Sequence, residues 1–186
     1  MSAHALPGWF GKLPGMGDFA HRRLPDSFRS VWDAWLQRGM ARLRDRHADW
    51  TAHYLEAPVW CFALGPGVAG DAAWIGVMMP SVDGVGRYFP FTLAGAAWGD
   101  AVQWWGLATR AALEGLEDDL DPERFDAVLG REFASAAAET GAPVVLPGHG
   151  ESVWMTDPGD GPSARMVVRG LPSGEQFEAL FLGGGE

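Results

Sequence analysis

The side chains best suited to bind or react with another molecule lie in one stretch, residues 78–92, which reads M-M-P-S-V-D-G-V-G-R-Y-F-P-F-T. Ser81 offers a hydroxyl, Asp83 a carboxylate and Arg87 a guanidinium within seven residues. The two glycines between Asp83 and Arg87 permit positive φ angles, which let a loop hold side chains in an unusual geometry. The stretch is either a binding site for a charged group or a tight turn held by an Asp83–Arg87 ion pair. Local chemistry favours the turn, because Asp, Ser and Gly are common turn residues.

A second glycine-rich stretch, residues 8–19, reads G-W-F-G-K-L-P-G-M-G-D-F and contributes Lys12 and Asp18. A lysine among glycines invites comparison with phosphate-binding loops. Here Lys12 precedes the later glycines and no Ser or Thr follows it, so the motif G-x-x-x-x-G-K-[ST] is absent. We therefore expect either an ordinary surface turn or a rigid loop that presents Lys12 and Asp18.

Tests for catalytic and metal-binding motifs give little support for an enzyme. The five histidines include no pair four residues apart and no H-E-x-x-H, so we expect no metal site. Ser81 lacks the G-x-S-x-G setting of a hydrolase nucleophile. Asp18 and Asp83 could act as an acid and a base if their loops meet, but no spacing requires this. The sequence thus predicts no catalytic residue and no cofactor.

Three short apolar runs, at residues 57–64, 73–79 and 87–95, predict neighbouring strands. Their β-branched and aromatic residues, and the turn residues between them, are typical of strands joined by short loops. Parallel pairing would need crossovers of about a dozen residues or more, and no helix intervenes here. We therefore expect an antiparallel meander.

Segments in which apolar residues recur every three or four positions predict helices. The expected helices span residues 26–46, 100–116, 122–139 and 175–182, and further strands are expected from Trp9 or Phe10 and at residues 144–146, 153–156 and 164–169. Asp26 or Ser27 is the expected N-cap of the first helix, and Asp121 that of the third. Together these elements predict one domain over residues 1–186, a mixed α/β fold of the α+β type, with helices flanking the faces of a mainly antiparallel central sheet. The two glycine-rich loops are expected to converge at one edge or end of that sheet.

The composition indicates a soluble protein of the cytoplasm. The formal net charge is −10 and the pI is near 4.8, which disfavours nucleic acids and anionic membranes as partners. The single cysteine, Cys61, cannot form an intrachain disulfide, and no apolar run approaches the about 18 residues of a membrane span. One face is nevertheless expected to be basic, because seven arginines crowd the first quarter of the chain: Arg22, Arg23, Arg29, Arg38, Arg42, Arg44 and Arg46.

Three strings of residues resemble the TagF family, also called ImpM, of type VI secretion accessory proteins. They are G-W-F-G-K-L-P-G-M-G-D-F at residues 8–19, R-R-L-P-D-S-F with W-D-A-W-L at residues 22–36, and M-P-S-V-D-G-V-G-R-Y-F-P-F-T at residues 79–92. The later S-V-W at residues 152–154 is similar to a C-terminal element of the family. The resemblance covers most of the chain, but residues 100–150 carry no string that we assign to the family.

This resemblance implies a non-enzymatic, cytoplasmic regulator that represses type VI secretion after translation. The implied partner is the forkhead-associated scaffold protein of that system. Binding is implied to act independently of, or alongside, a threonine phosphorylation switch that a kinase and a phosphatase operate. The alternative from another class is a small hydrolase or nucleotide-binding enzyme that uses the same glycine-rich loops.

Five residues within the matching strings form the candidate partner-binding site: Lys12, Asp18, Ser81, Asp83 and Arg87. Lys12 and Arg87 would donate hydrogen bonds to a carboxylate or phosphate of the partner. Asp18 and Asp83 would orient these cations or accept hydrogen bonds from the partner. The competing interpretation is that the two loops only hold each other in place.

Overall fold

A computed structural model of the protein describes residues 6–15, 19–96, 100–134, 146–156 and 164–183. Its strands form one seven-stranded sheet in the order β2-β1-β5-β4-β3-β6-β7, in which every neighbouring pair is antiparallel. The strands are β1 (Gly8–Gly11), β2 (Ala20–Arg22), β3 (Trp60–Leu64), β4 (Trp74–Met79), β5 (Phe91–Ala96), β6 (Glu151–Met155) and β7 (Arg165–Arg169). The helices are α1 (Asp26–Arg46), α2 (Trp50–Leu55), α3 (Ala101–Glu117), α4 (Pro122–Ala134) and α5 (Glu175–Leu182).

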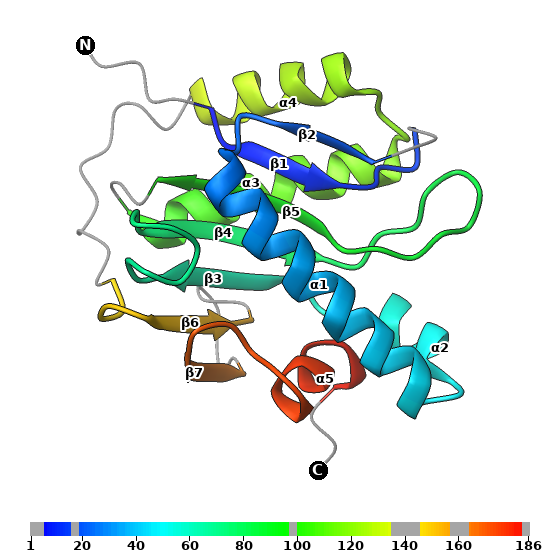
Figure 1. The fold of residues 1–186 in the computed structure, drawn as a ribbon. Coiled ribbons are helices and arrows are strands. Elements are labelled where there is room, and N and C mark those ends of the chain that lie inside the picture. Colours follow the sequence, from blue (N-terminus) through cyan, green and yellow to red (C-terminus); the bar gives the residue numbers. More distant parts are fainter. Residues whose placement is uncertain (1–5, 16–18, 97–99, 135–145, 157–163, 184–186) are drawn as a thin grey trace.

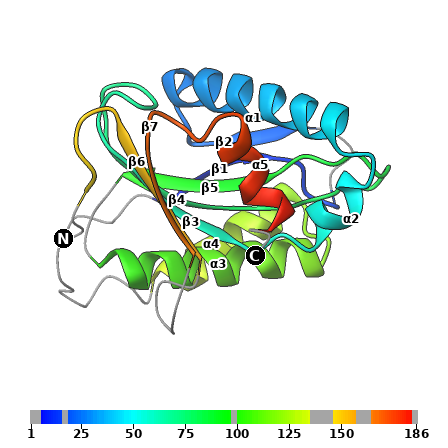
Figure 2. The same ribbon diagram turned by 90° about the horizontal axis from the view of Figure 1, so that it is seen from below.

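Helices cover both faces of this sheet, so the described chain forms three layers. Figure 1 shows α1 lying diagonally across the strands, with α2 and α5 beside its C-terminal half. In the view from below, α1, α2 and α5 lie on one side of the sheet, and α3 and α4 lie on the other (Figure 2). The predicted α+β fold, with an antiparallel sheet flanked by helices, is confirmed.

Successive side chains of a strand point to opposite faces of the sheet and therefore pack into two separate cores. In β3, Cys61 and Ala63 belong to the core beneath α3 and α4, whereas Phe62 and Leu64 belong to the core beneath α1 and α5. Because helices cover both faces, β3 is apolar at every position instead of every second one. The sequence pattern of continuous short apolar runs follows from this double burial.

Helix α1 packs across the middle of the sheet through its apolar, aromatic-rich face. Its buried residues are Phe28, Trp32, Trp35, Leu36, Gly39, Met40 and Leu43. Trp32 is fully buried and donates a hydrogen bond from Nε1 to Oγ1 of Thr92 in β5, over 2.9 Å. The recurrence of apolar residues at helical spacing thus predicts both the helix and the side that it buries.

The predicted N-cap of α1 is wrong. The helix begins at Asp26, and the residue before it is Pro25, whose carbonyl accepts the backbone N–H groups of Phe28 and Arg29. No side chain in the described part of the chain caps this end, because Asp26 lies inside the first turn and its carboxylate pairs with Arg29. The predicted cap of α4 is confirmed: the Asp121 carboxylate accepts the backbone N–H of residue 124 over 2.8 Å.

Several element boundaries differ from the predictions for physical reasons. Strand β3 begins at Trp60 and not at residue 57, since Pro58 has no N–H for a β-ladder. Strand β5 begins at Phe91, because the preceding residues are held in a loop. The short elements β2 and α2 were not predicted, as three and six residues are too few to show a period.

Two further predictions reach beyond the described residues. Of the strand predicted at residues 144–146, only Leu146 is described, and it lies outside any strand. The described part of α4 extends to Ala134, so the predicted end of this helix at residue 139 lies outside the described residues. None of the helices within the described ranges is both long enough and apolar enough to cross a membrane.

Candidate functional site

The two glycine-rich loops meet at one end of the sheet. Strands β1 and β4 both pair antiparallel with β5, so they run in the same direction and their C-terminal ends lie at the same end of the sheet. There the Ser81 hydroxyl donates to the backbone carbonyl of Lys12 over 2.6 Å. The Lys12 Nζ atom lies 3.6 Å from Oδ2 of Asp83. The predicted convergence of the loops is confirmed for their described residues.

Tyr54 of α2 anchors the start of the β4–β5 loop. Its hydroxyl donates to the Ser81 carbonyl and accepts the Ser81 backbone N–H, each over 2.9 Å. Burial raises the pKa of Tyr54 well above its ordinary value, so the phenol stays protonated and can serve both bonds. Ser81 is therefore fixed by its side chain to one loop and by its backbone to α2.

Asp83 is the polar centre of the β4–β5 loop. Its side chain is fully buried, and it accepts the backbone N–H groups of Val85 over 3.1 Å and of Arg87 over 2.9 Å. The Arg87 Nε atom completes the arrangement at 2.7 Å from Oδ2. Burial alone would raise the pKa of this carboxyl, but the hydrogen bonds from Arg87 and Val85 outweigh it and lower the pKa to about 2. Asp83 is thus ionised at neutral pH.

These contacts hold an exposed tip, residues 84–87, which we call the apex. The backbone N–H of Gly86 donates to the Asp83 carbonyl over 3.1 Å, and that of Asp83 donates to the Arg87 carbonyl over 3.0 Å. Gly86 has a φ of +81°, which a residue with a Cβ rarely adopts. Val85 is 71% exposed and the Arg87 side chain is 49% exposed. The apex therefore has a defined backbone conformation, although its side chains face solvent.

The Lys12 side chain is buried within the site. It is only 7% exposed, and its ammonium lies 5.0 Å from the ring centroid of Phe19. The Phe19 ring packs edge-on against Phe89, with centroids 4.6 Å apart. The Lys12 cation is therefore largely shielded from solvent.

The structure sorts the five predicted residues into different environments. Lys12, Ser81 and Asp83 are brought together and buried, and Arg87 joins them from the exposed apex. Asp18 lies outside the described residues. The Asp83–Arg87 ion pair of the turn interpretation is present. Sequence reasoning missed Tyr54 and Val85, because a buried tyrosine and an exposed valine have no distinguishing signal in the sequence.

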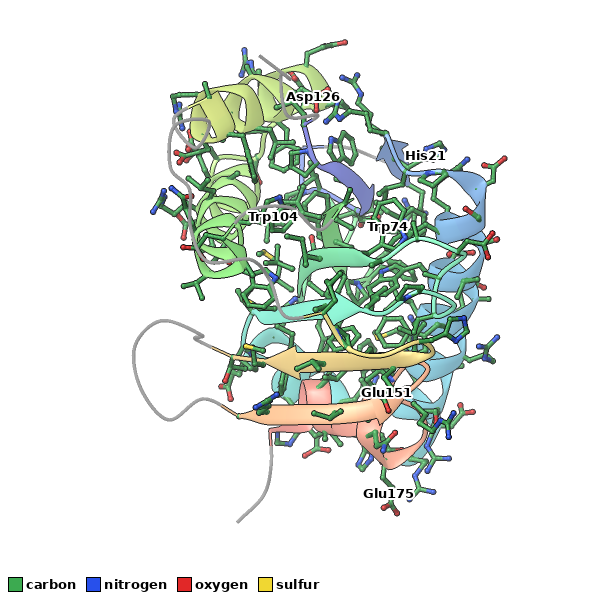
Figure 3. All side chains as sticks on the ribbon, turned by 90° about the vertical axis from the view of Figure 1, so that its left-hand side faces the viewer. His21, Trp74, Trp104, Asp126, Glu151 and Glu175 are labelled. Atoms are coloured by element: carbon green, nitrogen blue, oxygen red, sulfur yellow. The ribbon has the colours of Figure 1, made fainter. Side chains whose placement is uncertain are left out.

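A second ionic cluster, also missed, ties α4 to the edge of the sheet. Asp126 of α4 pairs with both Arg22 and Arg23 and accepts a hydrogen bond from Nε1 of Trp9 over 3.1 Å. Figure 3 shows Asp126 projecting from α4 toward strands β1 and β2. Burial opposes ionisation here, but the bonds from Arg23, Trp9 and Arg22 prevail and lower the pKa of Asp126 to about 2. The two adjacent arginines were visible in the sequence, whereas their partner 103 residues away was not.

Comparisons with known proteins agree with this arrangement. The family model of the TagF N-terminal domain, described as type VI secretion system-associated, matches residues 8–131. The crystal structure of PA0076 from Pseudomonas aeruginosa PAO1 is similar at 32% sequence identity and a TM-score of 0.75, covering 97% of this chain and 96% of that one. A search of curated proteins found no match. The matched region includes both glycine-rich loops, α1 and most of α4, and the chain therefore belongs to the TagF family of type VI secretion system-associated proteins.

Proposed function

We propose that this TagF protein is a post-translational negative regulator of type VI secretion, acting in the cytoplasm by binding the forkhead-associated scaffold protein through its apex. Membership of the TagF family supports the link to type VI secretion. One observation carries the binding role: the buried Asp83 carboxylate holds a loop whose outermost side chains, Val85 and Arg87, face solvent.

The low conformational freedom of the loop makes the apex a favourable contact surface. A lone exposed valine is common on protein surfaces and needs no explanation by itself. Here it stands on a loop whose polar groups bond inward, so the loop loses little conformational entropy when a partner binds. Arg87 is oriented by Asp83 through Nε, which presents its guanidinium in one direction for a carboxylate or phosphate of the partner.

Two features support binding over the hydrolase alternative. A general base works best when its pKa is near the working pH, whereas the pKa of Asp83 is about 2. The Ser81 hydroxyl donates its proton to the Lys12 carbonyl, so no described base is positioned to activate it as a nucleophile. We therefore propose that the buried polar groups of these loops hold the apex in place and that the protein is not an enzyme.

The experiment compares the purified chain with its Val85→Asp variant in binding to the purified forkhead-associated scaffold. Val102→Asp is the matched control, since Val102 is 47% exposed and lies in the first turn of α3, where an acidic residue is tolerated. We expect Val85→Asp to weaken binding at least tenfold and to release type VI secretion in cells, with an unchanged melting temperature. Val102→Asp should behave like the wild type.

The scaffold is used both after treatment with the threonine kinase and after treatment with the phosphatase. Equal affinity for the two forms would place this regulation alongside the phosphorylation switch, and unequal affinity would couple the two. If the wild type binds neither form, the proposed partner is wrong. If Val85→Asp binds as well as the wild type, the apex is not the contact surface.

A further inference from the structure

We propose that a cleft between α1 and the turn preceding α5 binds an acidic peptide segment of a partner protein. The cleft, which we call the arginine cleft, has a volume of about 230 Å³. Its lining includes the apolar residues Trp35, Gly39 and Phe177 and the polar residues Arg38, Arg42 and Ser173. None of these residues belongs to the loops around Asp83, so the inference is independent of the role of the apex.

The apolar floor of the cleft is rigid. Trp35 donates a hydrogen bond from Nε1 to the carbonyl of Pro172 over 2.6 Å, which ties α1 to the turn before α5. The Trp35 and Phe177 rings meet edge-on with centroids 5.4 Å apart. Gly39 lets the Phe177 ring approach the backbone of α1 closely. The floor therefore exists before any ligand binds.

The cationic wall of the cleft belongs to a ladder of arginines. Arg38, Arg42 and Arg46 follow one another every four residues along one side of α1, and like charges at this spacing destabilise a helix. Glu178 of α5 offsets the positive charge of the last two arginines. Its Oε1 atom lies 2.8 Å from Nε of Arg42 and 3.0 Å from Nε of Arg46. Among the described residues, Arg38 has no ion-pair or hydrogen-bond partner. An incoming anion would supply the missing charge.

Arg42 is placed to share that anion. Glu178 occupies its Nε, and its guanidinium carbon lies 4.0 Å from the position that a Cβ on Gly174 would take, at the turn that borders the cleft. The two terminal nitrogens thus remain as donors for a second acceptor. Glu175, at the start of α5, is exposed and projects outward from the molecule, so it does not close the cleft (Figure 3).

Size and charge select the kind of ligand. The cleft is smaller than the roughly 300–1,000 Å³ of sites that enclose a small molecule, which suits one or two side chains of a larger partner. A nucleic-acid backbone would bring many phosphates against the net charge of −10, whereas a short segment brings one or two acidic side chains directly to the arginines. Clusters of arginine recognise acidic motifs in peptides. An apolar floor beneath two arginines therefore fits a segment in which Asp or Glu stands next to a large apolar residue.

The test uses the full chain, labelled with ¹⁵N, and a short fluorescein-labelled peptide of Glu and Phe residues as the probe. A second peptide has Gln in place of every Glu. The Trp35 indole N–H is the reporter, because its hydrogen bond to Pro172 forms the floor of the cleft. We expect the Glu peptide to shift this signal and the amide signal of Gly174, and the Gln peptide to shift neither.

Two charge reversals then locate the binding by fluorescence anisotropy. Arg38→Glu should weaken binding of the Glu peptide at least tenfold, and Arg38→Ala should weaken it less in the same direction. The matched control is Arg124→Glu on α4, whose side chain is 77% exposed and which changes the net charge equally. Arg124→Glu should change the affinity for the Glu peptide less than twofold. Val85→Asp should bind the peptide like the wild type, which separates this site from the apex.

Three results would overturn the inference. They are an absence of binding at millimolar peptide, equal binding of the Glu and Gln peptides, and an affinity that Arg38→Glu leaves unchanged in a variant with the wild-type urea midpoint. A phosphothreonine peptide and inorganic phosphate are tested in parallel. If only these move the Trp35 signal, the cleft recognises phosphate and the acidic-peptide assignment is wrong.

Discussion

The ring of Phe177 in α5 occupies the space directly above Gly39 of α1, where a Cβ atom would lie 2.3 Å from two of its carbons. We expect Gly39→Ala to lower the free energy of unfolding by about 1–3 kcal/mol, because the buried ring must move. Gly106 of α3 has open space around its Cβ position, so Gly106→Ala should raise that free energy by about 0.5–1 kcal/mol. Urea titrations followed by tryptophan fluorescence measure both changes. Equal effects would contradict the packing argument.

The pH dependence of stability should report on Asp83. Its pKa is about 2 in the folded protein against an ordinary value of 3.8, so the unfolded chain binds more protons between these values. Stability from this group is therefore complete above about pH 4 and is lost as the pH falls toward 2. Asp83→Asn should reduce that dependence on pH, and it should cost about 2–4 kcal/mol at neutral pH because Lys12 stays buried without its carboxylate.

Urea midpoints measured from pH 6 to pH 2 test this prediction. Asp126 also has a pKa of about 2, so a reduced slope, and not a flat one, is expected for the Asp83 variant. Asp71→Asn, at an exposed position in a loop, provides the control and should keep the slope of the wild type. An unchanged slope in Asp83→Asn would show that other groups carry the acid sensitivity.

Removing the Tyr54 hydroxyl should loosen the loop that carries the apex. Tyr54→Phe leaves the Ser81 backbone N–H without its acceptor, and a buried unpaired donor costs about 1–3 kcal/mol. Hydrogen exchange at the amides of Val85 and Arg87 should become faster than in the wild type. Tyr88→Phe is the control, since the Tyr88 hydroxyl bonds to no described residue. Unchanged exchange in Tyr54→Phe would mean that Asp83 alone holds the apex.

The hydrogen bond between Trp32 and Thr92 should contribute to the docking of α1. Thr92→Val keeps the shape of the side chain and suits a β-strand, but it removes the only acceptor that the described residues provide for the buried Trp32 N–H. We expect a loss of about 1–3 kcal/mol in the free energy of unfolding, measured by urea titration. A variant as stable as the wild type would show that the bond adds nothing beyond the packing of the two side chains.

The sequence by itself determined the elements whose signals are local. The apolar residues of α1 recur at helical spacing from Phe28 to Leu43, and the structure has the helix over the predicted range, residues 26–46. The strands β3, β4 and β5 followed from short apolar runs with connections too short for a crossover. The TagF strings also lie within the region that the family model matches. In each case the information lies within a few neighbouring residues.

Only the tertiary structure decided what the charged residues do. Lys12 and Asp83 are 71 positions apart in the sequence, and they meet because β1 and β4 run in the same direction on either side of β5. Residue type does not reveal burial: Asp83 is hidden beneath an apex whose Val85 is exposed, the reverse of what polarity suggests. Pairing and solvent access depend on contacts between distant segments, and no local pattern in the chain records those contacts.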